Sequence, residues 1–479
     1  MKNTLKMFAT ITLTAVAVAN DTSAQDSWSF VMMGDTRGAD DTSIGINTNL
    51  NTMASMIASL NPKFVIVAGD MCNGNCLNTN SPLYPAAAAG NFTNDVAKAI
   101  YKGFFTNWQS AMQPVYDYNT HTGTPIYTVR GNHESNDTGQ TPIGVLKEAY
   151  YEMFSSFVPT NGPNNGTNDD ERGFSWSLTT NNVTFVAADQ YFNFDPTYVG
   201  GTTLWSGSHY LDQAWVTQQL AQSTSPYKVF IVHEPIFQTE GNGPGQMENQ
   251  DAQHFFGTNA AAMQTRENFW NDLGDAGAQL FLCGHLHLET VAATTNDHAH
   301  TIIQLTAGNG GAPPQNFINI PETGVTTLWN NGNYLLVTLV TNAPNNVVTN
   351  VSIVATFGFS LATVQDQKMT IQYYSLNPAS NSWTVADYTT VIASSRAKPT
   401  VSVPSDPRAG AFRYTRSDPA GTRLSYGVET STNLSNWNVD TAATQTVTAT
   451  TNNLQTVEVT LGGVKPLTAP NLFIRVVAQ

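Results

Sequence analysis

The sequence predicts a layered α/β domain followed by a small all-β module, and three observations support this. Short apolar strands alternate with helical stretches from residue 27 to about residue 390. These strands are apolar throughout instead of alternating with polar residues, which is typical of sheets buried on both faces. After about residue 394, short strands with polar turns replace the helices. A chain of 479 residues is long enough for both parts.

The first residues have the features of a secretory signal peptide, which we assign to residues 1–24. Lys2 and Lys6 form a charged segment, and residues 7–19 form an apolar segment that small residues follow. This apolar run is shorter than the ~20 residues needed to span a bilayer, and no later run is long enough. We therefore predict no membrane span and a secreted or periplasmic location.

The α/β domain is predicted over residues 27–393. Its strands are expected at residues 29–33, 64–69, 125–131, 183–189, 228–234 and 278–284. Its helices are expected at residues 50–60, 95–112, 211–223 and 261–274.

A linker that contains Pro and Ser is predicted at residues 394–407, and a small β-sandwich-like module at residues 408–479. The module's strands are expected at residues 412–417, 423–431, 445–450, 455–461 and 471–479. It holds no cluster of His, Asp or Glu, so we expect it to bind a surface or a glycan, to act as a spacer, or to be a structural cap.

The charge composition argues against a nucleic-acid polymer as partner. The formal net charge is −15, from 20 basic and 35 acidic residues, and only 11% of the residues are charged. Polyanions and anionic membranes are repelled by such a chain at long range. An anionic substrate would therefore have to be captured by a local positive site.

The three cysteines cannot all pair. Cys72 and Cys76 lie four residues apart, and a local disulfide between them is expected in an oxidising compartment. A cysteine-based zinc site would need a second pair, which the sequence lacks. Cys283 follows an apolar strand and is expected to be a small buried side chain.

Most predicted strands end in a residue that can bind a metal ion. A single Gly-Asp pair is ordinary turn chemistry, and a single His at a strand end is usually structural. Several such ends in one domain indicate a shared site. Carboxylates, imidazoles and an amide oxygen suit two divalent ions with one bridging Asp, and ions ~3.5–4 Å apart can clamp a phosphate ester. The strand-end residues are Asp35, Asp70, Asn132, His133, Glu134, His233, His285 and His287.

The order of the motifs GD, GD, GNHE, His and GHLH resembles the calcineurin-like metallophosphoesterases, in particular their secreted (purple) acid phosphatase branch. The likeness runs from about residue 30 to residue 314, and less clearly to about residue 390. It implies a four-layer α/β/β/α sandwich with the site at the strand ends. It also implies a small phosphorylated substrate and two divalent or trivalent ions of iron, manganese or zinc.

The resemblance implies a role for each metal-binding position. Asp70 would bridge the two ions. The first ion would also be held by Asp35 and His287, and the second ion by Asn132, His233 and His285.

The reaction that the resemblance implies is attack on a phosphomonoester by metal-bound hydroxide. His133 would be the general acid that protonates the leaving alkoxide, and Glu134 would orient its ring. Two alternatives stay open: a phosphodiesterase of the same fold acting on nucleotides or phospholipid head groups, and a degenerate surface protein whose C-terminal module does the binding.

Two positions depart from the family pattern. Many members carry a His that ligates the first metal where this chain has Arg37, and a guanidinium cannot be a ligand because it stays protonated. Arg37 would face the phosphate, pair with Asp35, or point away as a surface residue. Asn73 stands where the purple enzymes have a tyrosinate, so no purple iron site is expected.

The other histidines lie in polar segments and are expected to be solvent-exposed: His121, His209, His254, His298 and His300. Asp189 ends another strand, and its expected role is either hydrogen-bonding support or turn formation.

Overall fold

The computed structural model describes residues 27–37, 47–72, 93–134, 145–166, 170–192, 211–236, 260–296, 298, 300–313, 326–330, 334–338, 347–354, 356–365, 368–393, 400–402, 411–417, 426–431, 438–451, 454–462 and 473–478. The predicted signal peptide, Asn73, Cys76, His209 and His254 lie outside these residues. The chain divides into two compact units. One comprises Trp28–Val364 and Thr370–Thr390, and the other contains Val391–Gln479.

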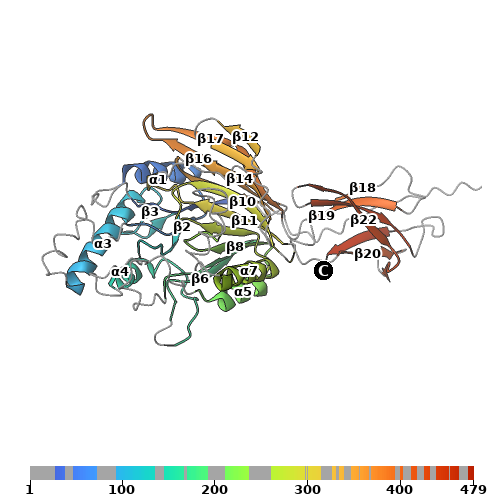
Figure 1. Ribbon diagram of the computed structural model, residues 1–479, viewed down its shortest axis with the longest axis horizontal. Helices are drawn as coiled ribbons and strands as arrows, with labels where there is room; N and C mark the ends of the chain where they lie inside the picture. The colour runs from blue at the N-terminus through green and yellow to red at the C-terminus, as the bar shows by residue number, and fades with distance from the viewer. Residues whose placement is uncertain are drawn as a thin grey trace, which may run out of the picture. The chain divides into compact units, whose positions relative to one another are not determined.

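In the described residues, a six-stranded sheet forms one half of the larger unit (Figure 1). Its strands β1, β2 and β5 run parallel, and β15 pairs antiparallel with β1. The order across the sheet is β17 (Ser382–Ala393), β16 (Lys368–Asn377), β15 (Phe357–Val364), β1 (Trp28–Met33), β2 (Val65–Ala68) and β5 (Ile126–Val129).

A nine-stranded sheet forms the other half. Strands β7, β8, β9 and β11 are parallel neighbours, and the flanking pairs are antiparallel. The order is β12 (Thr326–Asn330), β13 (Tyr334–Thr338), β14 (Val347–Val354), β10 (Glu289–Thr295), β11 (Thr301–Ala307), β9 (Leu280–Cys283), β8 (Tyr227–Ile231), β7 (Val183–Ala187) and β6 (Trp176–Thr180).

The two sheets face each other through aromatic side chains. Phe30 of β1 and Phe64, just before β2, both meet Phe185 of β7 edge-on, with ring centroids 5.0 and 5.3 Å apart. Such edge-to-face contacts are a favoured aromatic geometry. The inner faces of the strands are therefore covered by the partner sheet.

Helices cover the outer faces, which explains why the strands are apolar on both sides. The six-stranded sheet is covered by α1 (Thr48–Leu60), α3 (Asn94–Ala111) and α4 (Val145–Phe154) through one apolar cluster. The nine-stranded sheet is covered by α5 (Gln213–Gln222) and α7 (Ala260–Asp275) through another. The predicted four-layer α/β/β/α sandwich is confirmed.

Four of these helices agree with the predicted ranges to within two residues. The sequence analysis did not predict α4, although its buried residues Leu146, Ala149, Tyr150 and Phe154 follow helical spacing. The antiparallel strands from β10 onward were also not predicted individually. Among the described residues, no helix is both long enough and apolar enough to cross a membrane.

The C-terminal unit is all-β in its described residues, as predicted. One sheet contains β18 (Thr400–Ser402), β19 (Ala411–Ser417), β23 (Leu454–Thr460) and β22 (Thr444–Thr451). The other contains β21 (Asn438–Val439), β20 (Tyr426–Ser431) and β24 (Phe473–Ala478). A small core joins them, formed by Tyr414, Val428, Val457, Val459 and Leu461. Strand β18 lies inside the segment predicted as a linker, because its backbone pairs with β19.

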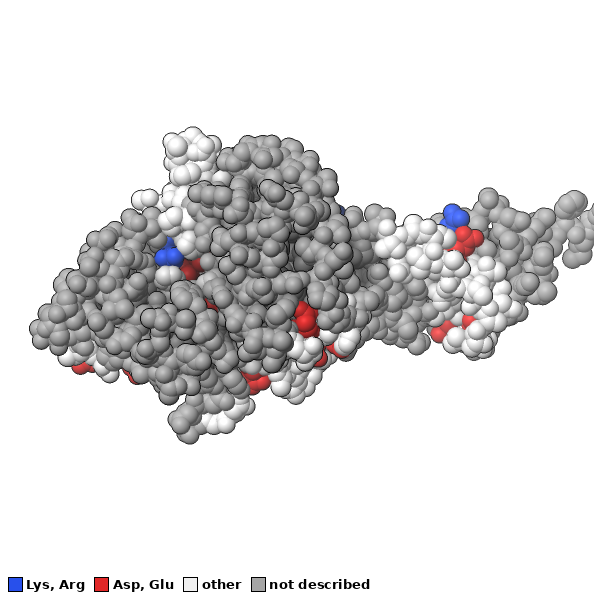
Figure 2. All heavy atoms as spheres, in the orientation of Figure 1, with Lys and Arg blue, Asp and Glu red and all other residues white. Residues whose placement is uncertain are grey.

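Among the described residues visible in Figure 2, the Lys, Arg, Asp and Glu side chains are scattered and form no large patch of one sign. This agrees with the low charged content of the sequence.

A chain that ends at Ala393 should fold without the C-terminal module. It keeps both sheets and both helix layers of the larger unit, and the module has its own core. We expect one cooperative thermal unfolding transition, measured by circular dichroism, within a few degrees of the corresponding transition of the full chain. Loss of cooperativity or aggregation of the shortened chain would contradict this.

Candidate functional site

The predicted site residues gather at one edge of the sandwich. Parallel strands place their carboxyl ends at the same edge of a sheet, and loops there commonly carry ligand-binding groups. In this chain Asp35 follows β1 and Asp70 follows β2, in one sheet. In the same way, Asn132 follows β5, His233 follows β8, and His285 and His287 follow β9.

The backbone turns sharply at three of these positions. Asp35, Asp70 and His285 have φ angles of 52°, 56° and 70°, in the left-handed region that non-glycine residues rarely adopt. Such conformations concentrate at functional sites, where the surrounding structure holds them in place. The turns direct these three residues away from the strand direction and toward one another.

Two glycines allow the loops to approach closely. A Cβ on Gly69, which has a φ of 84°, would lie 2.4 Å from Nδ1 of His233. A Cβ on Gly131 would lie 2.1 Å from Oδ1 of Asp70. Both distances are far inside van der Waals contact, so the glycines of the GD and GNHE motifs make room for the ligand side chains.

One group of ligands surrounds Asn132. Nδ1 of His233 lies 2.7 Å from the carbonyl oxygen of Ala68, so this nitrogen must donate. In the neutral ring, Nε2 then presents a lone pair 3.0 Å from Oδ1 of Asn132 and 3.3 Å from Oδ1 of Asp70. Nδ1 of His285 lies 3.1 Å from the same Asn132 oxygen. A cation placed among these atoms would satisfy them together.

A second group of ligands surrounds Asp35. Its Oδ2 accepts the backbone N–H of His285 at 2.6 Å. Its Oδ1 is buried, lies 3.6 Å from Nε2 of His287, and has no hydrogen-bond partner among the described residues. Nδ1 of His287 donates to the carbonyl oxygen of Pro313 at 3.0 Å, which leaves Nε2 as the lone-pair nitrogen.

The two aspartates concentrate negative charge in a buried place. One ligand atom each from Asp35, Asp70 and His233 lie within 4.8 Å of one another. Burial and the neighbouring Asp70 raise the pKa of Asp35 well above its ordinary value. Burial also opposes ionisation of Asp70, but His233, His133 and Arg37 together bring its pKa far below the usual range. This donor set fits metal ions that prefer oxygen and imidazole ligands.

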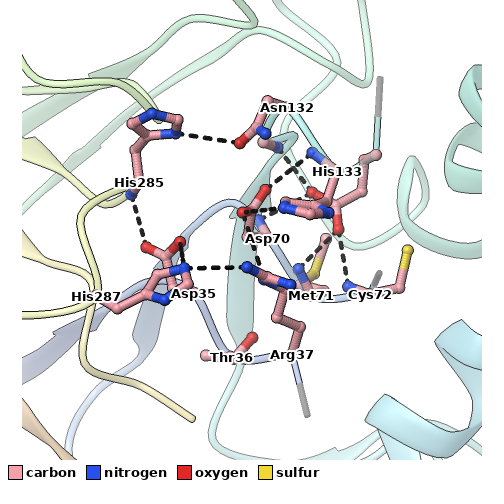
Figure 3. A network of polar contacts seen from close by, with 12 residues as sticks. Asp35, Thr36, Arg37, Asp70, Met71, Cys72, Asn132, His133, His285 and His287 are labelled. Carbon is pink, nitrogen blue, oxygen red and sulfur yellow. Dashed lines mark hydrogen bonds and ion pairs between the residues drawn. The ribbon is translucent and has the colours of Figure 1, made fainter. Parts of the chain in front are cut away.

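His133 lies at the side of this group. Its backbone N–H donates to Oδ1 of Asp70 at 3.0 Å, and its Nε2 lies 3.7 Å from Oδ2 of the same residue (Figure 3). The ring is 18% exposed. Burial, reinforced by Arg37, His233 and His287 against the opposing effect of Asp70, lowers the pKa of His133 to about 4. The ring is therefore accessible to a small substrate beside the ligands.

Glu134 has a different task from the predicted one. Its carboxylate accepts four backbone N–H groups instead of contacting the ring of His133. Oε2 accepts from Asp70 and Gly131 at 2.9 and 2.8 Å, and Oε1 accepts from Met71 and Cys72 at 2.7 and 2.9 Å. Glu134 thus joins the loop after β2 to the loop after β5, and it fixes the backbone of two ligand-bearing segments.

Arg37 lies inside the site, so the interpretation as a surface residue was wrong. Its Nη2 donates to Nε2 of His287 at 3.1 Å, and its Nε lies 3.8 Å from Oδ2 of Asp70 (Figure 3). The ion-pair partner is therefore Asp70 instead of Asp35. The side chain is only 14% exposed.

Sequence reasoning missed Arg130, which directly precedes the GNHE motif. Its Nε donates to Oδ2 of Asp189 at 2.7 Å, and both side chains are buried. Asp189 Oδ1 also accepts the N–H of Tyr191, so Asp189 serves both as hydrogen-bonding support and in the turn. A charged residue at the end of an otherwise apolar strand was the signal that could have identified this pair.

Several further predictions can be compared with the structure. Cys72 is a buried thiol that packs into the apolar cluster under α1 and α3. Its expected partner Cys76 lies outside the described residues, so the disulfide stays a prediction. Cys283 is buried as predicted. His121 and His298 are exposed as predicted, whereas His300 is half-buried and both His298 and His300 contact Asp275.

The family model for "Calcineurin-like phosphoesterase" matches residues 16–289, which is more than half of the chain. The chain belongs to the calcineurin-like phosphoesterase family. This family hydrolyses phosphate esters at centres that contain two metal ions. Membership confirms the resemblance at the level of the family and implies a phosphoric ester hydrolase.

Two solved structures are similar to this chain. "Structure of PhoD" has 11% sequence identity and a TM-score of 0.47, with 77% of this chain and 70% of that chain covered. Vacuolar Protein Sorting 29 from Cryptosporidium parvum has 9% identity and a TM-score of 0.26, with 77% of this chain and 98% of that chain covered. The comparison with curated proteins found no match.

Replacing Glu134 by Gln should loosen both ligand-bearing loops. An amide offers one acceptor oxygen, so two of the four N–H groups would face an NH₂ group instead. Hydrogen bonds to charged groups contribute about 1.5–3 kcal/mol each, so we expect the free energy of unfolding to fall by about 3 kcal/mol. Denaturant unfolding would measure this.

The matched control for that substitution is Glu148→Gln. Glu148 is 66% exposed and pairs with Lys98 on the surface. Exposed ion pairs of this kind contribute about 0–1 kcal/mol. Equal losses in the two variants would show that Glu134 does not hold the loops.

Proposed function

We propose that this protein is a secreted, acid phosphatase-like enzyme that hydrolyses small phosphomonoesters. The observation that carries the proposal is the convergence of two carboxylates, one amide oxygen and three imidazoles from five strand ends of a phosphoesterase fold. The side chain of His133 lies beside these groups and reaches the surface.

The donor atoms form two sets, and the set around Asn132 would hold a metal ion of iron, manganese or zinc. When bound, this ion would supply positive charge that polarises a phosphate ester and makes water a stronger nucleophile. Asp70 belongs to both sets. The set around Asp35 is completed by His287, and the set around Asn132 by His233 and His285.

Hydrogen bonds from the backbone orient the imidazole ligands. The carbonyl oxygens of Ala68 and Pro313 accept from Nδ1 of His233 and His287, which directs each Nε2 into the site. Partners of this type fix the tautomer and the ring orientation of metal-binding histidines. The site is therefore preorganised by the loops that carry it.

His133 is positioned to deliver a proton to the leaving oxygen. Asp70 holds its backbone through Oδ1, while Oδ2 faces Nε2. At acid pH, where a ring with a pKa of about 4 is protonated, it would donate to the alkoxide that departs as the ester bond breaks. The guanidinium of Arg37 contributes fixed positive charge near the same oxygen, Oδ2 of Asp70.

A secreted or periplasmic location follows from the signal-peptide features of residues 1–24, and it completes the proposal. We propose that the C-terminal module attaches the enzyme to a surface or a glycan. The net charge of −15 of the whole chain gives no reason to expect a nucleic-acid polymer as partner.

The test is hydrolysis of a panel of phosphomonoesters and phosphodiesters by protein reconstituted with manganese, zinc or iron. We expect monoester hydrolysis that is lost on chelation and regained with metal. Hydrolysis of diesters alone would favour the phosphodiesterase alternative. Protein that binds metal and hydrolyses no ester would favour the degenerate surface-binding alternative.

Replacing His133 by Ala should reduce turnover while metal content stays near normal. General acid catalysis contributes about 10²–10⁴-fold, and less where the leaving group is already acidic. We expect a large loss on an alkyl phosphate and a small loss on a nitrophenyl phosphate. His298→Ala, which alters a half-exposed imidazole outside the site, is the control. Equal losses on both esters would argue against the proton-donor role.

A further inference from the structure

We propose that the guanidinium of Arg37 takes the place of the first metal ion, so that the site binds one ion tightly, in the set around Asn132. This inference rests on the proposed function and specifies how the site captures phosphate. The ion and the guanidinium would be the two positive partners of the phosphate group.

The first argument is the lone pair of His287. Its Nδ1 donates to Pro313, so Nε2 is the nitrogen that could ligate an ion. Nη2 of Arg37 donates to this same Nε2 at 3.1 Å. A guanidinium is protonated at all ordinary pH values and offers only donors. The lone pair on Nε2 of His287 therefore accepts the hydrogen bond from Arg37 and is not directed at an ion.

The second argument is that the two oxygens of Asp70 face different partners. Its Oδ1 faces Nε2 of His233 at 3.3 Å, within the set around Asn132. Its Oδ2 faces Nε of Arg37 at 3.8 Å and Nε2 of His133 at 3.7 Å. The oxygen that would otherwise serve a first ion thus lies against a positive charge, and a divalent ion beside that charge would be repelled.

The third argument is that the fold fixes Arg37 in this position. Its backbone N–H donates to the carbonyl oxygen of Asp70 at 2.9 Å. Its own carbonyl oxygen accepts from Nδ2 of Asn47 at 3.1 Å, and Asn47 is the N-cap of α1. The backbone of Arg37 is therefore held both by the site and by the start of a helix.

The guanidinium lies near Asp35 as well, although its ion-pair partner is Asp70. Oδ1 of Asp35 is buried, lies 3.6 Å from Nε2 of His287, and has no hydrogen-bond partner among the described residues. The planar fork of an arginine also suits two phosphate oxygens at once, in a geometry that a lysine does not offer. With 14% of its side chain exposed, Arg37 remains within reach of a small ester.

The experiment counts ions without relying on turnover. The full chain, Arg37→His and Arg37→Ala are loaded with Mn²⁺, passed through metal-free buffer, and analysed for manganese content and by electron paramagnetic resonance. We expect about one ion and a mononuclear six-line spectrum for the natural chain, and about two ions with a coupled dinuclear spectrum for Arg37→His. Arg37→Ala should gain a second ion only at much higher free Mn²⁺.

Arg172→His is the matched control, because Arg172 pairs with Asp170 on the surface and its side chain is 49% exposed. It should retain the stoichiometry of the natural chain. If Arg37→His fails to fold, as judged by thermal unfolding, the natural chain and Arg37→Ala still decide the question. Two tightly bound ions in the natural chain would overturn the inference.

Hydrolysis measured on the same samples separates this inference from the proposed function. Two ions together with monoester hydrolysis would remove the inference and leave the function intact. One ion without hydrolysis of any ester would support the ion count and remove the function. One ion with hydrolysis, and weaker inhibition by inorganic phosphate in Arg37→Ala, would support both.

Discussion

The site depends on one electrostatic constraint: two aspartates, Asp35 and Asp70, are buried at nearly the same place. Buried like charges are costly unless cations or donors compensate them. Here His133, His233 and Arg37 all lower the pKa of Asp70, whereas the pKa of Asp35 rises. The two carboxyl groups therefore differ strongly in pKa. The demand for positive charge explains why imidazoles and a guanidinium converge on these carboxylates, and why an anionic ester would bind to a chain of net charge −15.

A third buried carboxylate, that of Glu134, stabilises the loops that carry these ligands. Glu134 accepts hydrogen bonds from backbone N–H groups of the loops after β2 and β5. These N–H groups therefore need no partner in a helix or sheet. Loops with unpaired buried N–H groups are unstable, and a single acceptor shared by four donors removes that cost for both. The left-handed turn at Asp70 lies directly under this acceptor, which helps to explain why the strained conformation persists.

Much of this could be predicted from the sequence, because the signal was local and repeated. Apolar strands that each end in Gly-Asp, Gly-Asn-His or Gly-His identify both a parallel sheet and a shared edge. The task of Glu134 could not be predicted, because three of its four N–H donors lie 62 to 64 residues away in sequence. Arg130 carried a signal, a charge at the end of an apolar strand, which the sequence analysis did not use. The expected link between Cys72 and Cys76 stays a prediction, because Cys76 lies outside the described residues. Spacing along the chain gave no information on the apolar cluster that buries Cys72.

Arg37 shows how a departure from a family pattern acquires meaning only in three dimensions. The sequence shows a guanidinium where a ligand is usual, and this alone fits a lost metal, a phosphate contact or a surface residue equally well. The structure places the group between His287 and Asp70, both of which a first ion would need. The guanidinium of Arg37 is a permanent cation in that place. It therefore stands both for the His ligand that the family pattern has there and for positive charge that the first ion would bring. The substitution then replaces only part of the positive charge of an ion, and it changes the chemistry of the site from two exchangeable ions to one ion and one fixed group.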